Sequence, residues 1–220
     1  MYSGQITESQ KALRSQLKNA LKGFVIEPSI LRVEKVITNN ASSYNFDIKK
    51  EGNESNSEVK LDTNDVFFAT HLGIYLLRAA NTERSRAVPQ TYPNQVVFPA
   101  VAGFVPEHLE IFFNAHLSVK IGTKEFISKL WTGFCRYVPQ TQQSTATNHS
   151  QRSAYDGLVE IEKIRFSGND QIEIKLSLNP FESTALQVAS ATAGVEHRVM
   201  LLVNGFLVKG AAQAKTEFGM

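Results

Sequence analysis

Apolar and polar residues alternate without interruption between residues 171 and 178. One face of this segment would carry the apolar side chains Ile172, Ile174, Leu176 and Leu178. A period of two is typical of a β-strand with one buried face. Residues 159–166 predict a second strand, and the intervening Ser167-Gly168-Asn169-Asp170 predicts a turn, because Gly and Asn tolerate positive φ. We therefore expect a β-hairpin at this point of the chain.

Shorter apolar runs extend this pattern to most of the chain. Further strands are expected near residues 31–37, 44–48, 59–61 and 96–98, and a second hairpin over residues 109–121 with another turn at 122–124. The run 65–78 fits either a helix or a buried strand. Its Phe, Val, Thr, Ile and Tyr residues and the glycine at position 73 favour the strand.

Residues 199–208 are apolar on both faces of a possible strand. One face would carry Met200, Leu202, Phe206 and Val208, and the other Val199, Leu201, Val203 and Leu207. Such a strand is expected either at the centre of a sheet that is covered on both sides or in contact with another chain.

Residues 7–23 follow a helical pattern instead. Thr7 and Gln10 form a capping-box pair, and Gly23 is a suitable C-terminal stop. Leu13, Leu17 and Leu21 recur at helical spacing. A basic stripe of Lys11, Arg14, Lys18 and Lys22 runs beside these leucines. The stripe is either a solvated face or a contact for an acidic partner, such as another subunit or nucleic acid.

These patterns predict an all-β protein, an antiparallel β-sandwich preceded by an amphipathic helix. The expected organisation is a helical arm over residues 1–24 and a single sandwich domain over residues 25–220. Sandwiches of this length are commonly single domains.

The composition of the chain mainly excludes certain classes of protein and certain kinds of site. With 220 residues, 42% of them hydrophobic, the chain can form a sizeable core. A net charge of +2 does not indicate strong capture of nucleic acid by the whole chain. Cys135 is the single cysteine, so an intrachain disulfide or a multi-cysteine zinc site is excluded. The polar first twenty residues and the short apolar runs predict no signal peptide and no membrane span, hence a soluble protein made in the cytoplasm.

The sequence carries no motif for catalysis, and we expect no catalytic, cofactor-binding or metal-binding residues. G-x-S-x-G, H-E-x-x-H, Walker and dinucleotide-binding patterns are all absent. The five histidines are scattered, and His71 is expected to be a hydrogen-bonded core residue. Cys135 lies among aromatic residues, which predicts a buried and inert thiol. Glu160 and Glu162 are expected to share an exposed strand face with basic neighbours.

Several stretches between residues 65 and 208 resemble structural proteins of bacterial viruses. They are Thr91-Tyr92-Pro93-Asn94 leading into Val97-Phe98-Pro99, the hairpin at 109–121, Val138-Pro139-Gln140-Thr141-Gln142, and Phe166-Ser167-Gly168-Asn169-Asp170. The resemblance implies a jelly-roll-like sandwich that self-associates in a virion shell or its attachments. It implies no catalytic residues.

Our first hypothesis is therefore a virion structural protein, capsid or capsid-associated, that binds its own copies and other virion proteins, with localisation in the virion. The expected assembly residues are Leu13, Leu17, Leu21, Met200, Leu202, Phe206 and Val208. A second hypothesis is a carbohydrate- or receptor-binding sandwich with Trp131, Tyr92 and Tyr137 as an aromatic platform. A hydrolase with an unfamiliar active site is the third.

Overall fold

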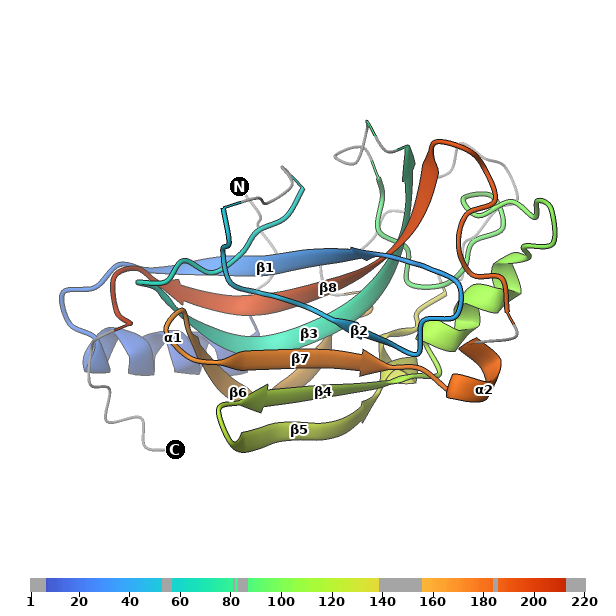
Figure 1. Ribbon diagram of the computed structural model, residues 1–220. Coiled ribbons are helices and arrows are strands. Elements are labelled where there is room, and N and C mark those ends of the chain that lie inside the picture. The colour runs from blue at the N-terminus through green and yellow to red at the C-terminus, as the bar shows by residue number, and fades with distance from the viewer. Residues whose placement is uncertain are drawn as a thin grey trace.

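The computed structural model describes residues 7–52, 57–80, 82, 87–138, 156–183 and 186–212. Eight strands form two four-stranded antiparallel sheets that pack face to face, with a helix at the N-terminus (Figure 1). The predicted all-β sandwich is confirmed. The predicted polar loop at residues 140–152 lies outside the described residues.

The first sheet, which we call sheet A, has the order β1-β8-β3-β6. Its strands are β1 (Ile26–Val36), β8 (Val195–Val208), β3 (Val66–Ala80) and β6 (Val159–Ser167). The central pair is long, since β3 pairs with β8 from Val66 opposite Val208 to Ala80 opposite Val195. The predicted strands at 31–37, 65–78 and 199–208 are therefore confirmed, and β8 is the central strand that its two apolar faces indicated.

The second sheet, sheet B, has the order β2-β7-β4-β5. Its strands are β2 (Ser43–Asn45), β7 (Ile172–Ser177), β4 (His116–Ile121) and β5 (Lys124–Trp131). Short non-strand elements complete the fold. These are the 3₁₀ helices η2 (Pro106–Phe112) and η3 (Thr132–Cys135) and the helical turn α2 (Pro180–Ser183).

The connectivity of the two sheets is that of a jelly roll. Strand β1 pairs with β8, β2 with β7, β3 with β6 and β4 with β5, so the second half of the chain pairs with the first half in reverse order. The additional pairs β3–β8 and β4–β7 join these four hairpin-like units into two sheets. Eight strands in two packed Greek-key sheets define this architecture.

The core fills the space between the sheets. Each sheet contributes the inward-facing residues of its strands, for example Leu201 of β8, Ile74 of β3 and Leu176 of β7, all fully buried. Alternation along β8 is uninterrupted. Val199, Leu201 and Val203 enter this core, whereas Met200 and Phe206 face the outer side of sheet A, as the pattern predicted.

Strand β3 departs from strict alternation because it contains a bulge. Its pairing with β8 advances by two residues on β3, from Ala69 to His71, and by one on β8, which leaves Thr70 as the extra residue. On the other side the same step spans Ile164 to Glu160, so there the extra residues lie on β6. Before the bulge Phe67 and Ala69 face the core, and after it Leu72 begins the core-facing series. A uniform strand would have placed residues 68, 70, 72 and 74 on one face, whereas the bulge leaves Phe68 on the outer face with Phe206.

The first predicted hairpin, at residues 159–178, was wrong. Both strands exist, but β6 belongs to sheet A and β7 to sheet B. The connection at 168–171 crosses from one sheet to the other. Gly168 lies against the backbone of the segment before β3, where an added Cβ would come within 2.1 Å of the Asp62 carbonyl oxygen. The glycine is therefore required by a close approach of two backbones.

The second predicted hairpin, at residues 109–121, was partly wrong. Residues 109–112 belong to the 3₁₀ helix η2, which begins at Pro106, a residue favoured at the first position of a helix. The buried residues of η2 include Leu109, Ile111 and Phe112. Their spacing looked like the alternation of a strand, but it arises because η2 is buried on several sides. The expected strand at 96–98 is likewise a turn. The turn at 122–124 is correct and joins β4 to β5.

The N-terminal helix α1 (Glu8–Ala20) packs against the outer face of sheet A (Figure 1). The Thr7–Gln10 capping box is present, and Gly23 has a φ of +93°. Leu13, Leu17 and Leu21 are buried with residues of β3 and β8. Gln10 donates a hydrogen bond to Thr70 in the β3 bulge, so the helix is held by polar as well as apolar contacts.

Replacing Leu17 by Ala tests how much this packing stabilises the fold. The side chain is fully buried under α1, so we expect a loss of about 2–5 kcal/mol in the free energy of unfolding. Urea unfolding, monitored by circular dichroism, measures this loss of stability. The adjacent and exposed Lys18→Ala is the control and should change stability by no more than about 0.5 kcal/mol. A Leu17→Ala protein as stable as this control would contradict the docking of α1.

Candidate assembly surface

Three aromatic side chains and one valine are exposed at and just beyond the end of β5. They are Trp131, Phe134, Tyr137 and Val138, which are 46%, 64%, 43% and 40% exposed. The rings of Trp131 and Phe134 pack edge to face with centroids 5.5 Å apart. Trp131 and Phe134 thus form an exposed apolar pair, and exposed apolar patches mark interaction sites. We call these four residues the aromatic ridge.

Local backbone structure holds the ridge in place. The 3₁₀ helix η3 turns the chain between Trp131 and Phe134, and its Gly133 lies directly against the indole ring. An added Cβ at this position would come within 2.3 Å of a Trp131 ring carbon, so only glycine allows the ring this position. The Thr132 hydroxyl donates to the Phe112 carbonyl, which fixes η3 to η2. The ridge is therefore presented by a rigid segment.

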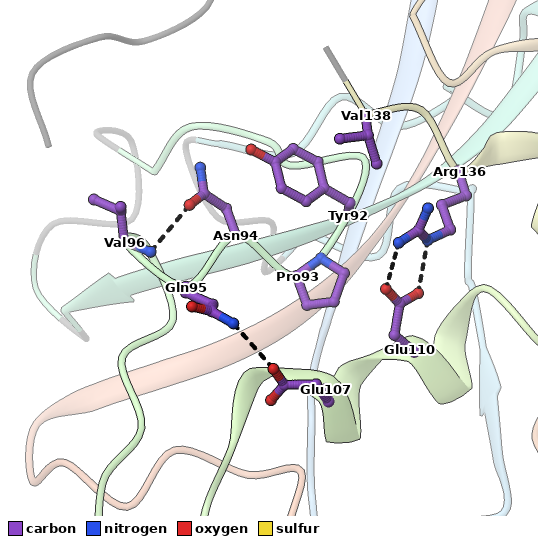
Figure 2. A pocket seen from close by; sticks show the side chains of 9 residues that line it. All are labelled: Tyr92, Pro93, Asn94, Gln95, Val96, Glu107, Glu110, Arg136 and Val138. Atoms are coloured by element: carbon purple, nitrogen blue, oxygen red, sulfur yellow. Dashed lines mark hydrogen bonds and ion pairs between the residues drawn. The ribbon is translucent and has the colours of Figure 1, made fainter. Parts of the chain in front are cut away.

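A shallow open pocket of about 460 Å³ borders the ridge at Val138 (Figure 2). Its polar side chains pair with one another. Arg136 donates two hydrogen bonds to Glu110, of 2.8 and 2.7 Å, and Gln95 donates to Glu107. Tyr92 and Pro93 supply apolar lining. The lining thus holds two carboxylates and one guanidinium, of which Glu110 and Arg136 form an ion pair.

The edge of sheet B next to the ridge is unsuited to pairing with another strand. The register of β4 and β5 shifts twice, between Leu117 and Val119 and again between Val119 and Lys120. Bulges and exposed lysines on an edge strand oppose the addition of a further strand. Lys124 and Lys129 are both exposed on β5. Contacts at this end of the molecule therefore depend on side chains.

The assembly residues predicted from the sequence lie inside the subunit. Leu13, Leu17, Leu21, Phe206 and Val208 form one cluster under α1. Met200 is buried in a separate outer-face cluster with Tyr75 and Leu77, and Leu202 packs against it half-buried. The chain itself covers these side chains, which accounts for their apolar character. Sequence reasoning did not single out the aromatic ridge as a candidate assembly surface, although it grouped Trp131 and Tyr137 with Tyr92 as a ligand platform.

The basic stripe of α1 faces solvent. Lys11, Lys18 and Lys22 are exposed and Arg14 is half-buried. Lys11 pairs with Glu8 at 2.6 Å. A contact of this stripe with an acidic partner stays a prediction.

Cys135 is fully buried, as predicted, and burial raises the pKa of its thiol to about 11, which disfavours the reactive thiolate. In the described ranges no group of three His, Cys, Asp or Glu side chains could hold a metal ion. No helix within those ranges is long and apolar enough to cross a membrane.

Two histidines are buried as core residues. His71 contacts Thr70 through Nδ1 at 3.0 Å, as predicted for a hydrogen-bonded histidine. His197 contacts the Val188 carbonyl oxygen through Nδ1 and packs between the rings of Phe98 and Phe104. Burial lowers the pKa of both imidazoles below the ordinary value of 6.5. Neutral histidine is thus the form that the folded protein favours.

No protein-family model matches this chain, and a search of curated proteins gives no significant match.

The lowered histidine pKa values predict an acid-sensitive fold. Below pH 6.5 the two imidazoles bind protons more readily in the unfolded chain than in the folded one. The contribution of these histidines to the free energy of unfolding is therefore complete above pH 6.5 and decreases as the pH falls. Thermal unfolding between pH 7.5 and 5 measures this. His197→Gln should flatten the decrease, leaving the part due to His71, whereas the exposed His116→Gln should not. Equal pH slopes for all three proteins would contradict this role of His197.

Proposed function

We propose that this protein is a structural subunit of a virus particle, a capsid or capsid-associated protein that acts by self-assembly. The jelly-roll connectivity supports the proposal, because this architecture is widespread among capsid proteins, although lectins and cupins share it. The observation that carries it is the aromatic ridge. Trp and Tyr are enriched at the energetic centres of protein interfaces.

The surroundings of the ridge also fit a contact between subunits. Arg136 and Glu110 beside the ridge pair with each other, so they can form a polar rim without leaving an uncompensated charge. Gly133 and η3 hold the rings in position before any partner binds. Such preorganisation lowers the entropy lost on association.

A second candidate function is carbohydrate or receptor binding. Trp131 and Tyr137 are exposed, and Tyr92 lines the neighbouring pocket, as the predicted platform requires. Aromatic faces of this kind suit the apolar faces of sugars. A glycan array separates the two functions: a glycan bound by a monomeric wild-type protein and lost in Trp131→Ala would favour this candidate over assembly.

Self-association and its dependence on the ridge can be measured directly. We expect the wild-type protein to form oligomers or particles by light scattering and electron microscopy. Phe134→Ser should weaken association at least about 30-fold, because loss of an interface hot spot costs about 2 kcal/mol or more.

Phe24→Ser is the matched control for this measurement. Phe24 is an exposed phenylalanine in the turn between α1 and β1, and it lies outside the ridge. Its substitution should leave association unchanged. A wild-type protein that stays strictly monomeric at high concentration and forms no particle would overturn the proposed function.

A further inference from the structure

The pocket beside the aromatic ridge carries an uneven charge. Both carboxylates of its lining come from η2, where Glu107 and Glu110 are three residues apart. A 3₁₀ helix has three residues per turn, so these two side chains leave η2 on the same side. Among the described residues, the lining supplies a single cation, Arg136. The pocket therefore holds one negative charge more than it holds positive charge.

The two carboxylates have different partners, as Figure 2 shows. Glu110 accepts two hydrogen bonds from the Arg136 guanidinium, so its charge is compensated. Glu107 instead accepts a 3.0 Å hydrogen bond from the neutral amide of Gln95, and it forms no ion pair with any residue in the described ranges. The excess charge of the pocket thus resides on Glu107, which can pair with a cation from outside the chain.

Hydrogen bonds hold the walls of the pocket in place. In loop 92–96 the Asn94 side chain accepts a 3.0 Å hydrogen bond from the Val96 backbone N–H. The backbone N–H of Tyr137 donates to the Thr91 carbonyl oxygen at 3.2 Å, and the Thr91 hydroxyl donates back to the Tyr137 carbonyl oxygen. These two bonds join the start of the loop to the segment that carries Arg136. A pocket formed in advance lowers the entropy lost when a ligand binds.

The pair formed by Arg136 and Glu110 indicates which cation suits Glu107. A guanidinium is planar and binds a carboxylate through two parallel hydrogen bonds, as Arg136 does here. Pro93 and Tyr92 supply apolar lining on which an aliphatic chain can rest. The volume of about 460 Å³ lies within the usual range for small-ligand sites.

We propose that this pocket binds a guanidinium group carried on an aliphatic chain, with Glu107 as its carboxylate partner. The ligand is a free alkylguanidine or an arginine side chain of another protein, because both present the same group. The site lies within one subunit, so this proposal goes beyond self-assembly and does not depend on it.

A matched pair of ligands tests the proposal on the full-length protein. N-acetyl-arginine amide carries the guanidinium, and N-acetyl-citrulline amide has nearly the same shape without the charge. In ligand-observed NMR titrations we expect the arginine compound to bind about fivefold more tightly, the ratio typical of one exposed charge pair. Glu107→Gln should abolish this preference. Glu173→Gln removes the same charge from an exposed position on β7 outside the lining and should retain the preference.

Two further ligands separate the possible sources of the guanidinium. Tighter binding of the peptide acetyl-Gly-Arg-Gly-amide than of butylguanidine would identify an arginine of a partner protein. Butylguanidine binding as tightly as the peptide, or more tightly, would identify a free guanidine.

Equal affinities for the arginine and citrulline compounds, or an arginine preference that persists in Glu107→Gln, would overturn the proposal. Circular dichroism checks that both variants are folded. Since the titration reports on ligand binding alone, a monomeric wild-type protein would overturn the proposed function and leave this site intact.

Discussion

Burial of β8 on both of its faces is the constraint on which the rest of the fold depends. The strand pairs with β1 along one edge and β3 along the other, and its inner side chains meet sheet B. Its outer side chains, such as Phe206, must also be removed from water. Helix α1 meets this need near one end of the strand, which explains why an amphipathic helix accompanies an otherwise complete jelly roll.

The sequence predicts a helix or strand correctly where a local pattern of residues alone determines its structure. The capping box at Thr7 and the two apolar faces of β8 follow from local spacing, and both are correct. Turn chemistry at residues 167–170 was correctly recognised but could not show that the two flanking strands enter different sheets. That choice depends on Gly168 meeting Asp62, a contact between segments more than a hundred residues apart.

The candidate surface was harder to predict than the fold. The sequence shows that Leu17 and Met200 are apolar, but not that the chain covers them itself. Conversely, Trp131 occurs in a mixed run where exposure has no periodic signal. Its position becomes evident only from η3 and from the contact of its ring with Gly133. Exposed apolar groups are identified by tertiary structure, because burial is a property of the whole fold.

The reversed pairing of the two halves has a consequence for how the protein is made. During synthesis β1 and β3 leave the ribosome long before β8, the strand that lies between them. Until residues near 208 emerge, sheet A has a gap at its centre and two unpaired inner edges. Contacts between residues so far apart in the sequence slow folding, and the unpaired, aggregation-prone strand edges stay exposed for longer. The nascent chain is therefore most exposed to aggregation just before β8 is released.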